Sequence, residues 1–406
     1  MRRRRNPLYD SHPIAGASLI KQVNYDVWNM VRSYILKVWS KEIDDNVIFV
    51  EKVFSYVEPL GILGGVSLAG YDVFNNVIAE SKGLFAIANY DGEGYIVSCV
   101  VSDNGFSSKN YFIAVAAEGE GIKVQVFLDE LIKMSVKSSG YKGKILKIFY
   151  DEVSDGVKIK PVERTNITLD DIFIGDDIKA DIKDFIDAVV NLSCDGMRYL
   201  FVGEPGTGKT DTMKAIINHC QTGNSQITVI ISDAGCGVGP GAIFEFASIF
   251  SPVLVCIDDI DLMVGTREKG MGHRGLSNML QILDGFVDIP GVFLIASTND
   301  RELVDEAVRR PGRFDQIVEF GALEPRFYPE IVYRETQDQR FADVFRDDEV
   351  VEVLSNFGAT GAFMVNLVKY LKRSRFEEKR YEPEFVIEVI NRLRSSFDIL
   401  PAKFGF

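Results

Sequence analysis

Apolar residues recur along this chain with different spacings, and these spacings divide it into regions. From Leu19 to about Glu42 they return every three or four positions, which predicts an amphipathic helix packed on its own domain or on a partner. Between residue 46 and about residue 160 they form short runs that are typical of β-strands. We expect strands at 47–50, 84–88, 95–101, 111–116 and 145–150, and a helix at 124–138. The pattern predicts an α+β domain over residues 44–160.

The second half of the chain alternates apolar strands with helical patterns. A polar stretch around Pro161 precedes it, and we place a linker at 161–167. Residues 168–320 have the order of strands and helices expected of an α/β core. Residues 321–406 predict a helical domain, with helices at 348–356, 363–375 and 383–395. Residues 1–43 are expected to be a disordered basic start followed by the amphipathic helix.

Charge limits the partners that the chain can have. Its 406 residues carry a formal net charge of −14, and an acidic surface repels a phosphate backbone, so general nucleic-acid binding is disfavoured. The basic run Arg2–Arg5 fits a solvated terminus, an anionic-membrane contact or a nucleic-acid contact. Residues 6–13 are too polar for a secretory signal, and the stretch 60–79 holds too many polar and glycine residues for a membrane span.

The cysteines and histidines give no sign of a metal site. The five cysteines form no Cys-x-x-Cys pair and are far apart, at 99, 194, 220, 236 and 256. Together with the lack of a secretory signal, this pattern indicates free thiols in a reducing cytoplasm. The histidines at 12, 219 and 273 are too widely spaced for a zinc cluster. The sequence therefore predicts a cytoplasmic protein.

Residues 203–210 read Gly-Glu-Pro-Gly-Thr-Gly-Lys-Thr and fit the phosphate-loop pattern G-x-x-x-x-G-K-[ST]. An apolar run precedes them and a helical segment follows, as the pattern requires. Glycines let backbone N–H groups turn toward phosphate oxygens, and the helix N-terminus adds its positive end. We expect Lys209 to reach the outer phosphates and the Thr210 hydroxyl to bind Mg²⁺. The expected nucleotide contacts here are Glu204, Pro205, Gly206, Thr207, Gly208, Lys209, Thr210 and Asp211.

A second apolar run, 252–257, ends in the carboxylates of Asp258 and Asp259. In an open α/β sheet, the carboxyl ends of the strands face the ligand crevice. We therefore expect Asp258 to hold Mg²⁺ through water and Asp259 to orient or activate the attacking water. The same pattern also fits a buried strand followed by an acidic surface turn, but the phosphate loop upstream favours the catalytic interpretation.

Further candidates follow a third apolar run, 292–297. Asn299 lies just after it and is expected to help place the attacking water. Arg310 and Arg313 flank a Pro-Gly turn, and arginines at such positions are usually surface salt-bridge partners. Because the backbone there is stiff, we also expect these two side chains to project outward, where they could act on a neighbouring molecule.

These segments together resemble the AAA ATPases, in the branch that carries the second region of homology. The resemblance covers residue 168 to about residue 370 and rests on segments 203–210, 257–261, 283–286, 297–299, 310–315 and 358–362. It implies that ATP and Mg²⁺ bind between an α/β core and a helical lid, with Gly361 and Ala362 over the adenine. It also implies a ring, usually a homo-hexamer, in which Arg310 and Arg313 reach the γ-phosphate held by the neighbouring subunit. Such an arginine can contribute ~10³–10⁵ in rate.

The chain departs from the family pattern at two functional positions. Asp259 stands where the family usually has Glu, and misplacing a reacting group by about 1 Å can cost on the order of 10²-fold in rate. Segment 232–241, where polypeptide-threading members carry an aromatic pair, offers only Val238 as a sizeable aliphatic side chain. This weakens the case for threading. Residues 266–274 match the second pore loop or form a mobile solvated loop.

The sequence predicts an ATP-dependent, ring-forming protein-remodelling ATPase that hydrolyses ATP at subunit interfaces, as a chaperone or unfoldase does. Protein substrates are expected to meet residues 44–160 and the pore. The chain has no His-Glu-x-x-His motif, which argues against a tethered protease. Two alternatives stay open: a nucleic-acid-dependent motor, and a weakly hydrolysing scaffold in which bound ATP only holds the ring together.

Overall fold

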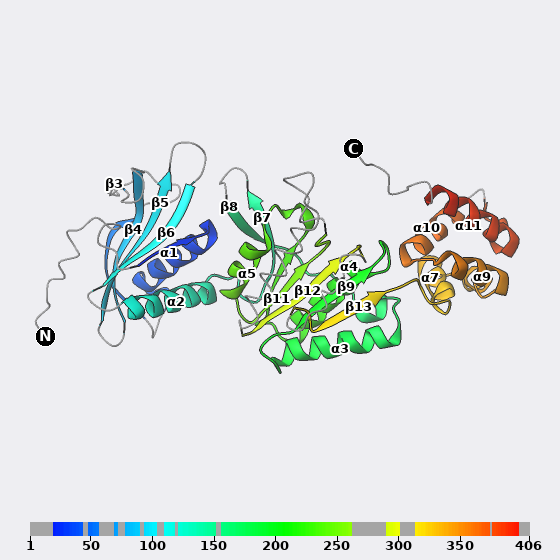
Figure 1. Ribbon diagram of the computed structural model, residues 1–406, viewed down its shortest axis with the longest axis horizontal. Coiled ribbons are helices and arrows are strands. Elements are labelled where there is room, and N and C mark those ends of the chain that lie inside the picture. The colour runs from blue at the N-terminus through cyan, green and yellow to red at the C-terminus, as the bar shows by residue number, and fades with distance from the viewer. Residues whose placement is uncertain are drawn as a thin grey trace, which may run out of the picture. The chain divides into compact units, whose positions relative to one another are not determined.

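The computed structural model describes residues 19–43, 48–56, 69–71, 78–89, 93–103, 109–117, 121–151, 156–261, 290–300, 313–373 and 376–397. Figure 1 shows the helices and strands of these residues. The chain divides into two compact units, each built from two stretches of the sequence. Unit one contains residues 1–163 and 225–253, and unit two contains residues 164–224 and 254–406.

Unit one contains a six-stranded sheet with the order β1-β6-β5-β4-β2, in which β3 pairs with β4. Its strands are β1 (Leu19–Val23), β2 (Ile48–Tyr56), β3 (Ala69–Tyr71), β4 (Ile78–Asn89), β5 (Gly94–Asp103) and β6 (Lys109–Ala117). Helices α1 (Tyr25–Trp39) and α2 (Gly121–Ser138) pack against each other and against this sheet (Figure 1). Burial alternates at the start of β2, where Ile48 and Val50 are buried while Phe49 is 62% exposed. The α+β prediction is confirmed.

The predicted helix from Leu19 is wrong for its first five residues. Leu19–Val23 form β1, which pairs antiparallel with β6. The helix begins only at Tyr25, because the Asn24 side chain accepts a hydrogen bond from the Val27 N–H at 2.8 Å and so caps the helix. The apolar stripe expected from the sequence is thus divided between a strand and a helix.

Three strands of unit one lie outside that sheet. β7 (Ile145–Asp151) pairs antiparallel with β8 (Gly156–Pro161) and parallel with β10 (Thr228–Ser232). Helix α5 (Pro240–Ser248) follows β10. The polar stretch around Pro161 thus begins with a strand, and residues 162–168 contain neither helix nor strand. The domain boundary at 160 stays a prediction, although strand pairing joins residues on its two sides.

The strands of unit two follow the order β13-β9-β12-β11. They are β9 (Arg198–Gly203), β11 (Val253–Ile257), β12 (Val292–Thr298) and β13 (Gln316–Phe320). β12 and β13 both pair with β9 in parallel. Strands of a parallel sheet covered on both faces are apolar throughout, and β11 is buried along its whole length. The carboxyl ends of β9 and β12 therefore lie at one edge of the sheet.

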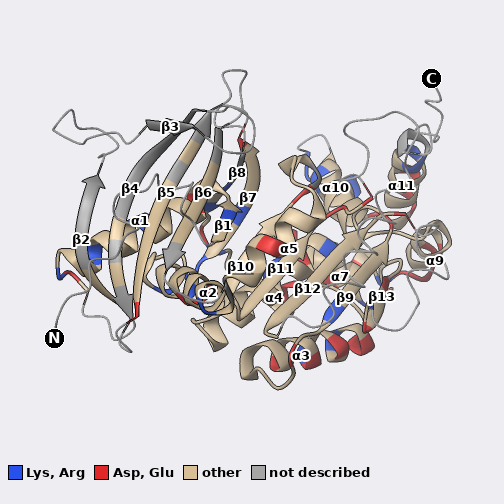
Figure 2. Cartoon of the chain, turned by 60° about the vertical axis from the view of Figure 1, so that its left-hand side comes forward, with Lys and Arg blue, Asp and Glu red and all other residues tan. Residues whose placement is uncertain are grey.

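One helix precedes β9 along the chain and another follows it. α4 (Lys209–Gly223) follows β9, and α3 (Asp176–Asn191) precedes it. Ile182, Phe185 and Val189 of α3 are buried at steps of three and four residues, while acidic and some basic residues lie elsewhere along the helix (Figure 2). α3 is thus a surface helix with one apolar stripe.

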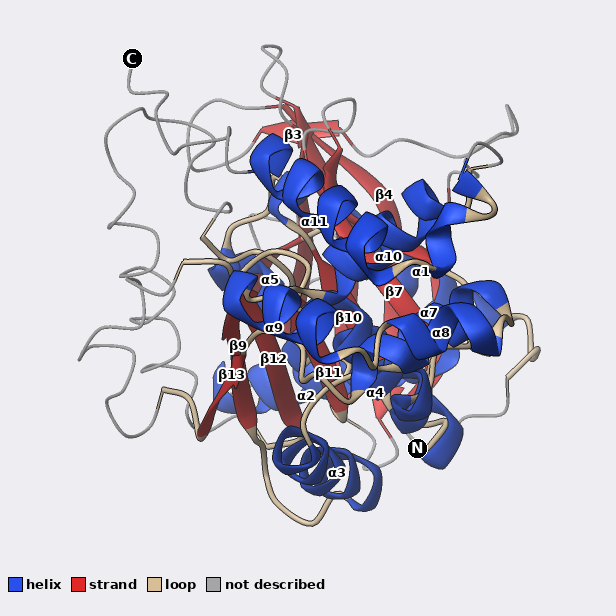
Figure 3. Cartoon of the chain, turned by 90° about the vertical axis from the view of Figure 1, so that its right-hand side faces the viewer, coloured by secondary structure: helices blue, strands red, loops and turns tan. Residues whose placement is uncertain are grey.

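Five further helices form the C-terminal part of unit two (Figure 3): α7 (Phe327–Thr336), α8 (Gln339–Val344), α9 (Asp348–Phe357), α10 (Gly361–Leu371) and α11 (Pro383–Phe397). Side chains of Asp338, Asp347 and Thr360 cap the starts of α8, α9 and α10. Their core includes the fully buried rings of Tyr328 and Phe341. The predicted fold class, an α/β core with a helical lid, is confirmed. No helix within the described ranges has the length and apolar content needed to cross a membrane.

Candidate nucleotide site

The phosphate loop joins β9 to α4 in unit two. β9 ends at Gly203 and α4 begins at Lys209. Gly206 and Gly208 have φ of +83° and +101°, a left-handed backbone that glycine adopts without strain. A Cβ on Gly206 would lie 2.7 Å from the Ala362 Cβ. The loop therefore forms a glycine-dependent cradle at the start of a 15-residue helix, as phosphate binding requires.

The lid helix α10 starts directly beside this loop. The Ala362 N–H donates to the Gly206 carbonyl at 3.2 Å. Thr360 caps α10 by accepting from the Phe363 N–H at 3.3 Å. Gly361 and Ala362, expected from the sequence to cover the nucleotide, thus lie against the phosphate loop.

Lys209 is held inside the loop by three acceptors. Its Nζ donates to the Gly203 carbonyl at 2.6 Å, to the Glu204 carbonyl at 2.9 Å and to Asn299 Oδ1 at 2.8 Å. The residue is only 5% exposed. An ammonium has three donor hydrogens, and all three are used here, so phosphate oxygens would bind by replacing these acceptors. The loop positions a cation at the place where the outer phosphates of a nucleotide would lie.

Thr210 and Asp258 form the second part of the site. The Thr210 hydroxyl donates to Asp258 Oδ2 at 2.9 Å, and the Ser297 hydroxyl donates to Asp258 Oδ1. A hydroxyl and a carboxylate are a donor set that suits Mg²⁺, which keeps several waters and takes its other ligands from phosphates. The residues therefore fit the predicted ion. Among the described residues no cluster of three or more His, Cys, Asp and Glu forms another metal site.

Asp259 has a backbone conformation that is unusual outside glycine. Its φ is +53°, and its N–H donates to the Ser297 hydroxyl at 3.0 Å. Aspartate is among the few residues that tolerate this region. Asn299 Nδ2 donates to Asp259 Oδ1 at 2.7 Å. Partial burial, followed by the Asp258 and Asp261 carboxylates, raises the pKa of Asp259, which makes it a better proton acceptor than an ordinary carboxylate.

Asn299 is fixed by the end of the strand that carries it. Thr298, the last residue of β12, donates to Asp261 Oδ1 at 2.9 Å. The same oxygen accepts from the Asn299 N–H at 3.3 Å. The amide of Asn299 is therefore oriented between Lys209 and Asp259, as a residue that places water should be. Asp261 has a supporting role that sequence reasoning did not assign.

A cavity of about 710 Å³ lies over these groups. Of the expected site residues, it is lined by Pro205, Gly206, Thr207, Gly208, Lys209, Thr210, Asp211, Asp259, Asn299, Gly361 and Ala362. Two further expected residues contact lining residues of the cavity. The Glu204 carbonyl accepts a hydrogen bond from Lys209, and the Asp258 carboxylate accepts one from the Thr210 hydroxyl.

Other lining residues are not among the expected site residues. Phe173 precedes α3, Arg334 lies in the last turn of α7, and Val365, Asn366 and Lys369 lie on α10. The α10 residues follow Ala362 at steps of three, four and seven, so the helical period starting from Ala362 could have found them. No comparable sequence pattern could have placed Arg334 at the cavity.

The predicted arginines are described only in part. Arg310 lies outside the described residues, as do segments 266–274 and 283–286 and the run Arg2–Arg5. Arg313 lies just before β13, and its carbonyl accepts from Arg198 Nη1 at 3.4 Å. In the single chain Arg313 is 8% exposed, so its side chain does not project freely outward as expected. Its action on a neighbouring subunit stays a prediction.

The segment after β10, in unit one, packs against β7. Val238 and Cys236 are each 4% exposed, and the Val238 N–H donates to the Cys236 Sγ at 3.3 Å. Lys147 of β7 pairs with Asp233. Val238 is therefore not available to contact a substrate in this conformation, which further weakens the case for threading.

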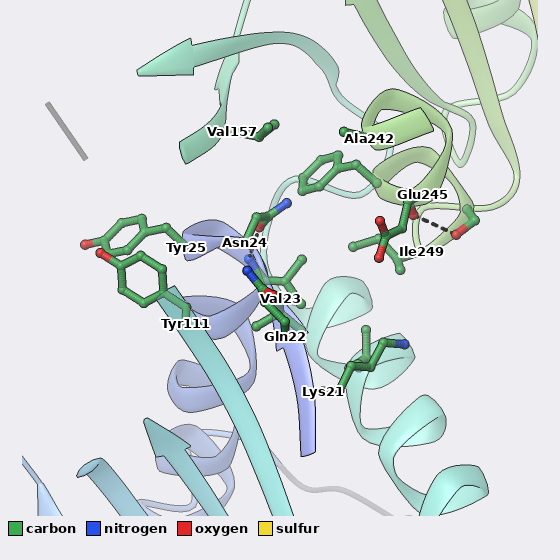
Figure 4. A pocket seen from close by; sticks show the side chains of 14 residues that line it. Lys21, Gln22, Val23, Asn24, Tyr25, Tyr111, Val157, Ala242, Glu245 and Ile249 are labelled. Carbon is green, nitrogen blue, oxygen red and sulfur yellow. Dashed lines mark hydrogen bonds between the residues drawn. The ribbon is translucent and has the colours of Figure 1, made fainter. Parts of the chain in front are cut away.

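Unit one also has a cavity of its own, of about 380 Å³, between β1, α1, α2, β8 and α5 (Figure 4). Its polar side chains support local structure. Asn24 caps α1, and Lys21 lies 3.6 Å from an Asp129 carboxylate oxygen. The Ser248 hydroxyl donates to the Glu245 carbonyl at 2.7 Å. These contacts assign no reaction to the cavity.

The fold and the site of unit two define an α/β phosphate-loop nucleotide-binding protein. Residues 199–322 match the model of the ATPase family associated with various cellular activities (AAA). This stretch of the chain is therefore similar to an AAA ATPase domain. The family match and the geometry point to the same residues, since 199–322 include the phosphate loop, Asp258 and Asn299.

Several curated proteins are similar to this chain. The ATP-dependent zinc metalloprotease FtsH 2 of Alkaliphilus metalliredigens is 33% identical over 259 residues, 58% of this chain and 36% of that protein. Proteasome-activating nucleotidase 2 of Haloferax volcanii is 35% identical over 182 residues, 41% of this chain and 43% of that protein. The peroxisomal ATPase PEX6 of Saccharomyces cerevisiae is 34% identical over 184 residues, 41% of this chain and 18% of that protein.

These likenesses cover only part of each relative. The matches account for between 18% and 43% of the length of the three proteins. Among solved structures, the Holliday-junction branch-migration motor RuvB of Thermotoga maritima has a TM-score of 0.40 and 19% identity, over 56% of this chain and 72% of that one. A structural likeness at this level has no bearing on function.

Proposed function

We propose that this protein is an ATP-dependent, ring-forming ATPase that remodels proteins, as a chaperone or unfoldase does. One observation carries the proposal: a single amide, Asn299, contacts both Lys209 at 2.8 Å and Asp259 at 2.7 Å, beside the Thr210–Asp258 pair. Phosphate contacts, ion ligands and a carboxylate base thus converge on one cavity. The AAA family match supports ATP as the nucleotide.

Each residue of the site has a separate role in the proposed hydrolysis. Bound ATP and Mg²⁺ supply the reactive phosphoryl group and neutralise part of its charge. Lys209 and the backbone N–H groups of the loop hold the phosphates, and Thr210 and Asp258 hold the ion. Asp259 accepts a hydrogen bond from the attacking water and draws its proton, while Asn299 keeps the Asp259 carboxylate in place. Positioning and charge neutralisation are the main contributions that phosphoryl transfer needs.

The finer parts of the proposal concern assembly and substrate. We infer a homo-hexamer in which Arg310 and Arg313 complete the site of the neighbouring subunit, protein substrates received by residues 44–160, and a cytoplasmic location. A relative named as a proteasome-activating nucleotidase supports a protein substrate, since it is 35% identical over 182 residues. Arg313 would have to turn outward in the assembled ring, since it is 8% exposed in the single chain.

Mixed rings test this proposal. Asp258→Ala subunits lack the ion ligand, and Arg313→Ala subunits lack the trans arginine, so each homogeneous ring should be inactive. Rings that contain both should recover part of the ATP turnover, because some interfaces then join an intact pocket to an intact arginine. No recovery in rings shown by native mass spectrometry to be mixed would count against action across an interface.

Stimulation of turnover separates the possible substrates. An unfolded protein should raise the ATPase rate, whereas stimulation by DNA or RNA that fades with added salt would favour the nucleic-acid motor instead. The control is the same measurement with folded protein of equal size. Stimulation by unfolded protein indicates a protein-remodelling ATPase, and stimulation by DNA or RNA indicates a nucleic-acid motor.

A weakly hydrolysing scaffold is the second candidate, and Asp259 favours it. The carboxylate is one methylene shorter than the glutamate usual in the family, and Val238 is buried in the segment where threading members grip their substrate. The Asp259→Glu variant distinguishes the two candidates. A large rise in turnover with unchanged assembly would indicate that the natural protein uses ATP mainly to hold its ring.

A further inference from the structure

The nucleotide cavity has lining residues outside the phosphate loop, and two of them are cationic side chains. Ile172, Ile331 and Val365 supply apolar walls there. Arg334 of α7 and Lys369 of α10 lie among them. Neither cationic side chain can accept a hydrogen bond. The proposed hydrolysis uses neither of them, so their place in the cavity needs another explanation.

Arg334 is held in a defined position. Its guanidinium carbon lies 4.5 Å from the centroid of the Phe173 ring, and its Nη1 donates to the Asp171 carbonyl. A planar guanidinium stacked on an aromatic face is pre-organised, so little freedom is lost when its remaining N–H groups bind a ligand. Four of its five donor hydrogens stay available after the bond to Asp171. Arg334 is therefore a fixed donor group at the wall of the cavity.

One acceptor oxygen nearby is already engaged within the chain. Asp171 also lines the cavity, but its Oδ2 accepts from the Thr168 N–H at 2.9 Å and from the Thr168 hydroxyl at 2.8 Å. Asn366 is left as a side chain that can both donate and accept. A base that enters this part of the cavity can therefore meet the N–H donors of Arg334, Asn366 and Lys369.

We propose that Arg334 reads the purine base and that the site accepts 6-oxopurine nucleotides, GTP and ITP, alongside ATP. Guanine presents two acceptors, N7 and O6, on the edge where adenine presents one acceptor and the N6 amino donor. A guanidinium satisfies both acceptors of guanine, whereas it leaves the adenine amino group facing another donor. This inference rests on the proposed function, because it assigns the base to the pocket that binds the phosphates.

Binding measurements on the full chain with Mg²⁺ test the proposal. Fluorescent analogues of ATP and GTP give the ratio of the two dissociation constants for the wild type and for Arg334→Met. The wild type should bind GTP no more than about tenfold more weakly than ATP, and Arg334→Met should weaken GTP by about a further tenfold while changing ATP little. Arg334→Lys, which keeps the charge without the planar pair of donors, should lose GTP in the same way.

A matched control removes the same charge elsewhere in the lid. Arg346→Met deletes an exposed arginine whose Nε lies 3.4 Å from Asp343 and which does not line the cavity, so it should leave the ratio unchanged. Equal losses of ATP and GTP in Arg334→Met would mean that Arg334 only supports the lid, and the proposal would fall. ATP binding with GTP excluded by more than about 100-fold would overturn this inference alone. Absence of binding for both nucleotides would overturn the proposed function as well.

Discussion

Asn299 and Lys209 are joined by a hydrogen bond of 2.8 Å between the amide oxygen and the ammonium group. The other end of the same amide donates to the Asp259 carboxylate at 2.7 Å. One side chain from the end of β12 therefore connects the group expected to bind phosphate with the group expected to activate water. A substitution of Lys209 or of Asp259 can therefore alter the position of the other side chain through Asn299.

Removing the Lys209 ammonium should abolish nucleotide binding. In Lys209→Ala, the affinity for ATP should fall by on the order of 10²-fold or more, because charge-assisted bonds to phosphate are lost. Titration with a fluorescent ATP analogue measures the loss, and circular dichroism checks the fold. Lys214→Ala is the control, since Lys214 lies on the same helix and pairs only with exposed Asp211 at 2.8 Å. An unchanged affinity in Lys209→Ala would refute the phosphate-loop assignment.

Neutralising Asp259 should stop hydrolysis without preventing binding. Asn has nearly the same shape as Asp and tolerates the φ of +53° at this position, so Asp259→Asn should keep the fold. Loss of the base should lower ATP turnover by about 10²–10⁴-fold while the affinity stays near that of the wild type. Asp187→Asn, an exposed change on α3, serves as control. Turnover that persists in Asp259→Asn would assign the base to another residue.

Position 206 should not tolerate even the single methyl side chain of alanine. Gly206→Ala would place a Cβ 2.7 Å from the Ala362 Cβ and would hold an alanine at φ +83°. The left-handed backbone alone costs an L-residue roughly 1–2 kcal/mol, so the variant should unfold at lower denaturant concentration and bind ATP more weakly.

Two companion variants separate the causes of that loss. Adding Ala362→Gly to Gly206→Ala removes the methyl contact but leaves the backbone strain, so recovery should be partial. Gly321→Ala is the control, because a Cβ there would meet no atom within 4 Å. A Gly206→Ala protein as stable as Gly321→Ala would show that the loop adopts another conformation.

The buried cysteines should be slow to react in the native protein. Burial raises the pKa of Cys99 and of Cys220 to about 12, and it also raises the pKa of Cys256 well above the ordinary value. Since the thiolate is the reactive form, these thiols stay protonated and unreactive at pH 8. Cys194 is only partly buried and should be alkylated first.

Peptide mapping by mass spectrometry after a timed reaction with iodoacetamide measures this order. All five cysteines should react once the chain is denatured, which controls for the chemistry of each site. Alkylation of Cys220 as fast as that of Cys194 in the native protein would show that α4 opens readily.

Local sequence was enough to predict the phosphate loop, the acidic strand end and the lid helices α9, α10 and α11, whereas α7 and α8 were not predicted. Each of these features depends on residues that are close together along the chain. Glycines at fixed spacing before Lys209 determine the loop, and capping residues with periodic apolar positions determine the helices. Parallel strands buried on both faces are apolar throughout, so the runs that end before Asp258 and Asn299 were also visible.

Only the tertiary structure decided where the ambiguous segments belong. Leu19–Val23 could have continued the helix, but pairing with β6 makes them a strand. The sequence left open whether the segment around Val238 faces a pore or forms an inert turn, and the fold buries the Val238 side chain, which is 4% exposed. Arg334 of α7 lines the nucleotide cavity although it lies more than 100 positions beyond the phosphate loop. Its contacts with the Phe173 ring and the Asp171 carbonyl hold it there. The reason is the same in each case: the energy of these residues depends on neighbours that are distant in sequence, and no local pattern records them.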